Sequence, residues 1–328
     1  MIKWQLSLGT LLLALVVLAI GLPHANGTWF AFWNANESLQ ANEWILLTVY
    51  RIPEVFIAVL AGMALAISGL LLQTVLNNPL AGPSILGLTS GSHLFVALVL
   101  MGGSFSSDLF QDVSTTFAAA FGAFVFGMLI LLIATKMRSA VSLLLVGMML
   151  GTFVSAFTGL LMSHADSMSL KSFTMWSFGS LQQVALDQIP LISSVFIVVF
   201  IAALFLVKPL NAMVLGEHQA AFLGVNIVRN RWVVILIVSL LTGLVTAFCG
   251  PIAFIGLIVP NIVKMTLKTA NHLHLMIASA LIGGIVLLIC SMLIRLIEPL
   301  IVLPINTLTS LIGAPVVLLL LLKKIRNA

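Results

Sequence analysis

Apolar residues occur in long runs separated by short polar segments, and this pattern extends over nearly the whole chain. A run of about 20 apolar residues is long enough to cross the hydrocarbon core of a bilayer as a helix. Ten runs approach that length and predict ten membrane-spanning helices. Their ranges are 6–24, 53–76, 85–102, 115–135, 140–162, 189–207, 232–249, 252–268, 276–295 and 306–322.

The boundary between the seventh and eighth runs is short, because only Gly250-Pro251 separates them. The distribution of basic residues decides between nine and ten spans. With ten spans and a cytoplasmic N-terminus, all of the 14 Lys and Arg residues except Arg51, Lys171 and Arg295 lie on the cytoplasmic side. That bias is the one expected of membrane proteins. Merging the two runs would place the basic groups of the C-terminal third outside, so we expect ten spans and two cytoplasmic termini.

The composition agrees with this interpretation. Of 328 residues, 61% are hydrophobic and 7% are charged, whereas a soluble domain has about 25% charged residues. No polar stretch is long enough to bury a core of its own. The sequence therefore predicts an all-α, polytopic membrane protein in which residues 1–328 form a single transmembrane domain. The outer stretch 163–188 is expected to be an interfacial helix or a loop with an anchoring Trp.

The sequence lacks the residues and motifs that several kinds of function require. The spans have almost none of the acidic or basic groups that proton-driven carriers place in the membrane. His93 stands alone in span three, so it is expected to be a structural histidine. No Gly-Lys dipeptide is present, which excludes a phosphate-binding Gly-rich loop. We therefore expect no catalytic residue, no metal, no cofactor and no nucleic-acid partner. Such a bundle is a passive channel or the membrane partner of a separate motor.

Small residues recur at every fourth position in two spans, which places them on one face of each helix. In span five they are Gly147, Gly151, Ser155 and Gly159. In span two they are Ala58, Gly62, Ala66 and Gly69. Such a face favours close helix packing, or else it opens room for a bulky cargo beside the helix. The sequence alone leaves both interpretations open.

Two cytoplasmic segments have an unusual composition. The stretch from Leu76 to Pro83 carries no charge and contains two prolines, which predicts a stiff turn suited to a gate. In the second segment, Gly216 and Gly224 bracket about two helical turns with apolar residues in a water-facing position. This short helix is interpreted as a docking surface for another protein, or as an amphipathic helix on the lipid headgroups.

Several blocks of sequence resemble one family. They are Arg51-Ile52-Pro53, residues 64–73, residues 78–91, Leu215-Gly216-Glu217, Leu223-Gly224-Val225, residues 250–260 and residues 309–315. In content and order these blocks resemble the FecCD-type permeases, the membrane subunits of ATP-binding-cassette importers for ferric siderophores, haem and cobalamin. Only span one and the two longer outer loops lack a recognisable match.

The resemblance implies partners. A second permease subunit, identical or similar, would complete the transmembrane unit. Two ATPase subunits would bind on the cytoplasmic side, and an extracytoplasmic substrate-binding protein would deliver the cargo. The residues implied in ATPase coupling are Gly216, Glu217, Ala220, Ala221, Leu223, Gly224 and Val225. Those implied in the gate and the translocation path are Asn78, Pro79, Leu80, Ser139, Ser142, Gly147, Gly151, Ser155 and Gly159.

Docking of the delivery protein is expected to involve two outward-facing arginines, Arg51 and Arg295. An Arg–carboxylate pair is bidentate and directional, which suits this role, although Arg295 is also close enough in sequence to pair with Glu298. Relatives often carry a second basic residue where this chain has Glu54. The charge pattern of docking is therefore expected to differ here.

The sequence thus predicts a subunit that is not itself an enzyme and that moves a ferric siderophore across the bacterial cytoplasmic membrane by alternating access. ATP hydrolysis is assigned to a separate chain. Haem and cobalamin are the alternative cargoes, and the 14 methionines do not decide among them because Met is a common filler of apolar helices. A secondary carrier or channel is the more remote alternative.

Overall fold

The regular structure of the chain is helical throughout the part described by the computed structural model, which covers residues 2–21, 45–102, 108–136, 140–298 and 300–326. The first half contains α1 (Ile2–Gly21), the π-helical turn η1 (Leu46–Arg51), α4 (Ile52–Val75), α5 (Leu88–Gly102), α6 (Asp108–Lys136), α7 (Ala140–His164) and α8 (Ser167–Phe178). The second half contains η2 (Leu186–Gln188), α9 (Ile189–Leu204), α10 (Val207–Met213), α11 (Glu217–Phe222), α12 (Ile227–Cys249), α13 (Ile255–Leu267), α14 (His272–Ile297) and α15 (Ile305–Arg326).

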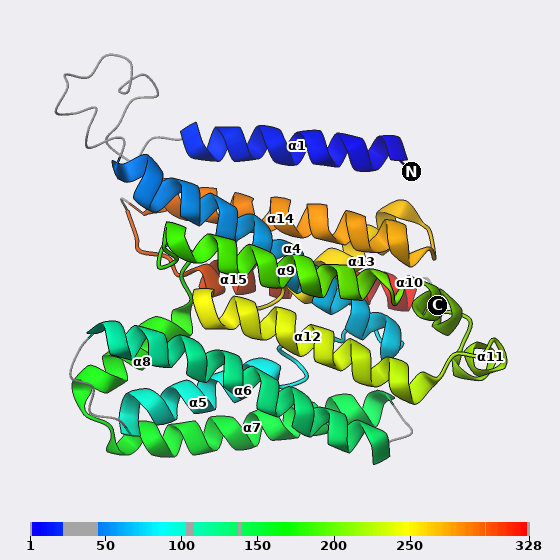
Figure 1. Ribbon diagram of the computed structural model, residues 1–328, viewed down its shortest axis with the longest axis horizontal. Helices are drawn as coiled ribbons and strands as arrows, with labels where there is room; N and C mark the ends of the chain where they lie inside the picture. Colours follow the sequence, from blue (N-terminus) through cyan, green and yellow to red (C-terminus); the bar gives the residue numbers. More distant parts are fainter. Residues whose placement is uncertain (1, 22–44, 103–107, 137–139, 299, 327–328) are drawn as a thin grey trace.

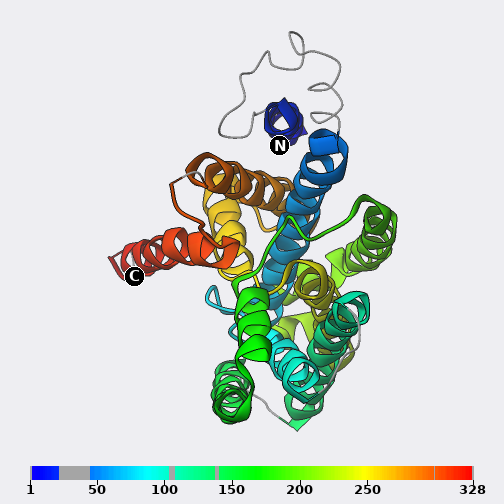
Figure 2. The same ribbon diagram turned by 90° about the vertical axis from the view of Figure 1, so that its left-hand side faces the viewer.

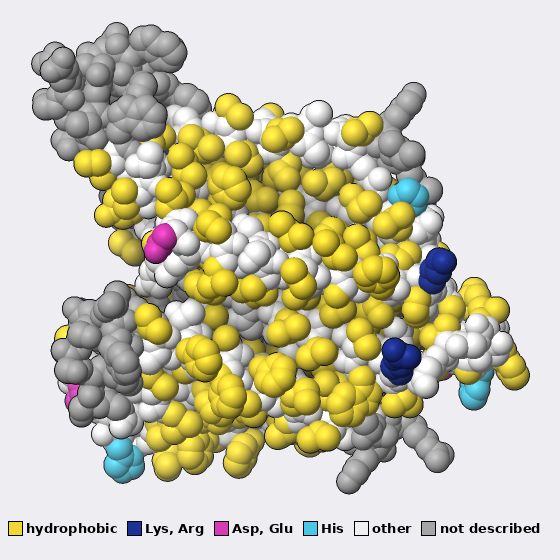
Figure 3. Space-filling view, in the orientation of Figure 1, with side chains coloured by type: hydrophobic (Ala, Val, Ile, Leu, Met, Phe, Trp, Pro, Cys, Tyr) yellow, Lys and Arg dark blue, Asp and Glu magenta, His cyan; other side chains and the backbone are white. Residues whose placement is uncertain are grey.

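The long helices run roughly parallel or antiparallel to one another, and Figure 2 shows the bundle nearly end on. The start of α1, the end of α15 and the short helix α11 lie at the same end of the bundle, while α8 lies at the other end (Figure 1). Figure 3 shows a broad hydrophobic surface between these ends, with the charged side chains of this face gathered near them. This arrangement agrees with the predicted orientation, in which α11 is cytoplasmic and α8 is outside.

Ten of the described helices are apolar enough to serve as spans. Seven have the length of a full crossing, and three shorter ones, in the ranges Leu88–Gly102, Ile255–Leu267 and Ile305–Leu319, complete the set. The predicted all-α, polytopic fold is therefore confirmed. The two shortest spans begin three residues later than predicted, because apolar but non-helical segments precede α5 and α13. Such backbone is tolerated at membrane depth only where protein surrounds it or it lines a cavity.

Glycine contacts hold α4 at the centre of the bundle. Gly62 of α4 faces the backbone of Gly283 in α14, and Gly69 faces the backbone of Gly256 in α13. A Cβ atom at either position of α4 would collide with a carbonyl group of the facing helix. The stripe of small residues in span two thus serves close packing, which is the first of the two interpretations drawn from the sequence.

Replacing Gly69 by Ala is expected to destabilise the protein by about 3 kcal/mol, the upper end of the usual cost of overpacking. The new methyl group meets the rigid backbone of Gly256, which cannot rotate away as a side chain would. The measurement is the thermal unfolding midpoint of the purified chain in detergent. Gly9→Ala is the matched control, since nothing lies within 4 Å of a Cβ there. Equal midpoints for the two variants would contradict the packing argument.

The Gly250-Pro251 boundary is a tight turn between two separate helices, as predicted. Helix α12 ends at Cys249, Gly250 adopts a φ of +70°, and α13 begins at Ile255. A Cβ on Gly250 would lie 2.7 Å from the carbonyl oxygen of Trp176 in α8. The turn therefore fixes the end of α8 against the bundle.

The predicted interfacial segment 163–188 contains a helix, α8, rather than only a loop. Asp166 caps its start by accepting hydrogen bonds from the backbone N–H groups of Met168 (3.0 Å) and Ser169 (3.1 Å). A hydrogen bond from the Ser169 side chain, together with these backbone bonds, lowers the pKa of the Asp166 carboxyl group. The cap gives α8 a defined start beside the end of α7.

Candidate functional site

A cavity of about 810 Å³ lies in the outer half of the bundle between α5, α7, α8 and α15. Most of its lining side chains carry a hydroxyl or amide group: Thr89, Ser90, Ser155, Thr158, Ser177, Asn306, Thr307 and Ser310. The others are His93, Val154, Phe173, Phe178 and Leu311. No carboxylate, ammonium or guanidinium group is among them in the described part of the chain. We call this cavity the outer chamber. It offers hydrogen bonds and apolar contact to a guest but no formal charge.

His93 of α5 lines the outer chamber and is held in a fixed orientation. Its Nδ1 lies 2.8 Å from the backbone carbonyl oxygen of Thr89. Its ring makes edge contacts with Phe173 and Trp176 of α8, at centroid distances of 6.3 and 5.3 Å. His93 therefore has two features. One ring nitrogen is satisfied by the backbone, as expected of a structural histidine, and the ring also lines the chamber.

The stripe of small residues on α7 has two roles at two depths. A Cβ on Gly147 would lie 2.9 Å from the Cα of Leu86, and one on Gly151 would lie 3.2 Å from the Ser90 hydroxyl oxygen. Nearer the outer end, Ser155 lines the chamber and Gly159 has open space beside it. The inner half of the stripe serves packing, whereas the outer half leaves room next to the cavity.

The segment between α4 and α5 is a fixed, mostly buried turn. The Asn78 side chain accepts a hydrogen bond from Leu80 N (2.9 Å), and Asn261 of α13 donates one to the Pro79 carbonyl oxygen (2.8 Å). Asn78, Pro79 and Leu80 are each half-buried. This placement beside the inner end of the bundle suits the predicted gate. Of the other predicted gate residues, Ser142 lies half-buried at the start of α7, and Ser139 falls outside the described residues.

The predicted coupling segment forms the short helix α11, with positive φ angles at Gly216 (+105°) and Gly224 (+82°). At its end, Gly224 N donates to Ala221 O (3.0 Å) and Val225 N donates to Ala220 O (3.0 Å), a Schellman arrangement. Neither glycine has an atom within 4 Å of a Cβ position, so the backbone angle rather than space requires glycine there.

The exposed surface of α11 differs in part from the predicted one. Phe222 is 92% exposed and Leu223 65% exposed, whereas Ala220 is completely buried. Ala220 therefore cannot contact a docked protein, because it faces the rest of the chain. Glu217, at the start of the helix, forms an ion pair with Arg231 of α12, and this pair ties α11 to the bundle. Phe222 belongs with Leu223 in the candidate docking surface.

A group of polar side chains links α10 to the inner ends of α4 and α14. Asn211 Oδ1 accepts a hydrogen bond from His272 N (2.8 Å) and lies 2.9 Å from His272 Nδ1. The other ring nitrogen of His272 lies 2.9 Å from the Thr74 hydroxyl oxygen. Next to them, Lys264 donates to the Gln73 side chain (3.1 Å). The contacts join residues that are 61 (Asn211 with His272), 191 (Gln73 with Lys264) and 198 (Thr74 with His272) positions apart in sequence. The sequence pattern does not reveal them.

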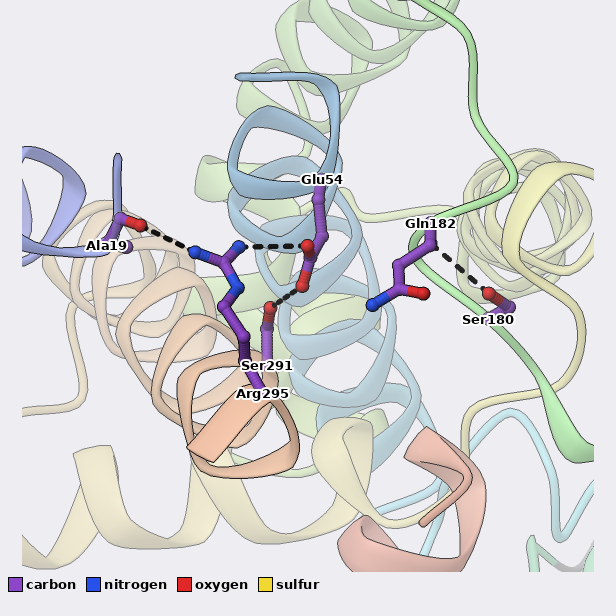
Figure 4. Close-up of polar contacts among 6 residues, drawn as sticks. All are labelled: Ala19, Glu54, Ser180, Gln182, Ser291 and Arg295. Atoms are coloured by element: carbon purple, nitrogen blue, oxygen red, sulfur yellow. Dashed lines mark hydrogen bonds and ion pairs between the residues drawn. The ribbon is translucent and has the colours of Figure 1, made fainter. Parts of the chain in front are cut away.

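The two arginines predicted to face outward are buried in the structure. Arg51 is 5% exposed and Arg295 is 3% exposed. As Figure 4 shows, Arg295 donates to Glu54 (2.8 Å) and to the Ala19 carbonyl oxygen (2.7 Å), and Ser291 donates to the other oxygen of Glu54. The predicted exposed position of both residues is therefore wrong for this conformation. Arg295 is paired within the chain, and its partner is Glu54 rather than Glu298.

Glu54 explains why Arg295 lies inside. An arginine in the apolar interior needs a carboxylate and further hydrogen-bond acceptors to offset its lost hydration. Glu54 and the end of α1 provide them from segments 241 and 276 residues away in sequence. Glu54 thus holds Arg295 and Ser291 together at the outer end of the bundle. A cavity of about 240 Å³ adjoins this cluster and is lined by Glu54, Ser291 and the segment 178–183, among others.

Comparison with known proteins agrees with this geometry. The model of the FecCD transport family matches residues 11–323. The hemin transport system permease protein HmuU of Yersinia pestis is 33% identical over 324 residues, which cover 98% of this chain and 96% of that protein. The vitamin B12 import system permease protein BtuC of Vibrio cholerae is 31% identical over 322 residues, which cover 98% and 95%.

A solved structure supports the same assignment. An inward-facing structure described as of a metal-chelate type ABC transporter superposes with a TM-score of 0.83 at 27% identity, over 98% of this chain and 100% of that one. The family model, the two relatives and this fold all agree with the motifs recognised in the sequence. The chain belongs to the FecCD transport family.

Proposed function

We propose that this chain is the membrane-spanning subunit of an ATP-driven importer that carries a bulky iron complex across the cytoplasmic membrane. Membership of the FecCD family makes it a multi-pass permease of that membrane. The observation that carries the proposal is the helix α11, which presents Phe222 and Leu223 to the cytoplasm. An exposed apolar helix end in water is a docking surface for another protein, and the chain itself lacks a phosphate-binding loop.

The outer chamber and the turn at Asn78–Leu80 suit alternating access. The chamber receives the complex in the outer half of the bundle, where hydroxyl and amide groups replace part of its hydration without binding it tightly. Transport requires binding that is strong enough for entry and weak enough for release. The buried turn, anchored by Asn261, blocks the inner end until the ATPase moves α11 and the helices joined to it.

The outer wall of the chamber indicates a second permease subunit. Helix α7 exposes Met149 (69%) and Phe153 (69%) next to the chamber residues Val154 and Ser155. A second copy, or a similar chain, would cover this face and complete the path. An extracytoplasmic binding protein would deliver the complex at the end that carries α8. Docking through Arg51 and Arg295 stays a prediction, and it requires their side chains to become accessible.

A ferric siderophore, the cargo predicted from the sequence, fits a chamber lined with neutral hydrogen-bonding groups. Iron porphyrins and corrinoids form a second candidate class, favoured by His93. A coordinatively saturated siderophore has no use for an imidazole nitrogen, whereas a macrocyclic metal complex with a free axial position does.

The test is affinity purification of the tagged chain in mild detergent, with mass spectrometry of the particles. We expect two permease chains and two ATPase chains per particle, with a binding protein retained after mild cross-linking. The composition also separates a homodimer from a heterodimer of permeases. Recovery of the chain alone, even after cross-linking in intact membranes, would contradict the proposal and favour a carrier or channel.

A further inference from the structure

His93 is the one side chain of the outer chamber that can donate a nitrogen lone pair to a metal, among the lining residues that the structure describes. We propose that Nε2 of His93 coordinates the metal of the transported complex while the complex occupies the chamber. The chamber then retains complexes that have an exchangeable coordination position, in preference to saturated ones. This inference rests on the proposed import function, which it narrows to a class of cargo.

The contact with Thr89 fixes the tautomer of His93. A carbonyl oxygen only accepts hydrogen bonds, so Nδ1, at 2.8 Å from Thr89 O, must carry the proton. In the neutral ring, Nε2 is then the nitrogen with the free lone pair. Within the described part of the chain, Nε2 makes no hydrogen bond. Nε2 is also not one of the completely buried side-chain atoms that lack a partner, so it is at least partly accessible. Metal-binding histidines are held in the same way, with the second nitrogen donating to a carbonyl or carboxylate oxygen.

The ring of His93 is also immobilised before any complex arrives. Its edge contacts with Phe173 and Trp176 have interplanar angles of 74° and 76°. The ring is thus held by its own helix, through Thr89, and by the facing helix α8. A preorganised ligand loses little conformational entropy on binding. Phe173 and Phe178, which also line the chamber, offer apolar surface for a flat organic ligand.

A single imidazole cannot hold a bare metal ion firmly, since protein metal sites use three or four ligands. No group of three His, Cys, Asp or Glu side chains suited to a metal is present in the described part of the chain. The metal must therefore arrive within an organic ligand that supplies the other donors. One added nitrogen gives a reversible bond, as a transport site requires. Iron in a planar four-nitrogen macrocycle is such a complex, and histidine is a common axial ligand of it.

The experiment titrates the permease, assembled with its ATPase in lipid nanodiscs, with ferric protoporphyrin IX. We expect the absorption spectrum of a ferric porphyrin with a single axial imidazole, which is high-spin with water or no ligand at the sixth position, in the wild type. In His93→Ala we expect loss of this spectrum and roughly tenfold or more weaker binding. Free imidazole added to His93→Ala should restore the spectrum, which a purely structural role of the ring would not allow. His93→Phe keeps an aromatic ring against α8 and should also lack the spectrum.

Three controls make the result specific. His164→Ala should behave as wild type, because His164 is exposed at the end of α7 and does not line the chamber. Iron-free protoporphyrin and a hexadentate iron trihydroxamate should bind equally to wild type and His93→Ala. An unchanged spectrum and affinity in His93→Ala would overturn the inference, as would an equal loss of binding for the iron-free ring.

The proposed function is tested separately by ATP-driven uptake of iron complexes into vesicles. ATP-driven uptake of ferric protoporphyrin that persists without any change on His93 substitution refutes the metal contact but leaves the importer intact. A wild-type assembly that shows the His93-dependent spectrum but moves no iron complex refutes the importer and leaves the metal contact standing.

Discussion

Replacement of Leu223 by Asp is expected to reduce ATP-driven uptake by a hundredfold or more while the chain still inserts into the membrane. Leu223 is 65% exposed next to Phe222 at the end of α11, so a charge there is harmless in the isolated subunit. In the assembled importer it would be buried in an apolar contact, at a cost of roughly 3–5 kcal/mol. Each 1.4 kcal/mol weakens binding about tenfold. The measurement is uptake by vesicles together with stimulation of ATP hydrolysis.

Asn226→Asp is the matched control for this variant. It adds the same charge three residues away, at an exposed position where Asn226 caps α12 by accepting from Arg229 N (2.9 Å). Aspartate caps a helix as well as asparagine does. Gly224→Asp is the weaker test, because the φ of +82° strains any side chain at that position and would disturb α11 directly. Normal coupling in Leu223→Asp would show that the ATPase docks elsewhere.

Replacement of Arg295 by Met is expected to destabilise the protein by about 3–5 kcal/mol, because it leaves Glu54 buried without its cation. The double variant Glu54→Gln with Arg295→Met should recover most of this loss, since neither buried charge then remains. The unfolding midpoint in detergent is the measurement. Arg231→Met, which removes the more exposed pair with Glu217, should cost less than about 1 kcal/mol.

The comparison between single and double variants also bears on delivery. If the double variant is stable and still binds the delivery protein, Arg295 has a structural role and docking uses other groups. If Arg295→Met has wild-type stability, the ion pair contributes nothing measurable, and the role of Arg295 lies elsewhere.

The helices were predictable from the sequence because their signal is local. Length and hydropathy identify each span, and the basic residues orient it, so the turn at Gly250-Pro251 was also predictable. The late start of α5 was not, because residues 85–87 continue the apolar run and differ from the helix that follows only in where their backbone hydrogen bonds go. Apolar composition reports burial in the membrane and does not report helical geometry.

The candidate site was predictable only where it consists of one segment. Helix α11 and its two glycines are adjacent in the chain, and their pattern was sufficient. The outer chamber combines residues 89–93, 154–158, 173–178 and 306–311, so the environment of His93 depends on how four helices meet. The pairing of Arg295 with Glu54 depends in the same way on contacts across 241 residues. A single sequence carries no signal for how residues on different helices lie relative to one another.

The contacts of Asn211 with His272, and of His272 with Thr74, have a mechanical consequence. Helix α10 directly precedes α11. Asn211 ties α10 to the start of α14, and His272 in turn joins α14 to the inner end of α4. Thr74 lies only a few residues before the turn at Asn78–Leu80. Under the proposed function, we expect a displacement imposed on α11 to reach that turn through this linkage of short elements, without bending a long helix. A small movement at the cytoplasmic surface would then move the inner turn directly, because little of it would be absorbed by bending between the two.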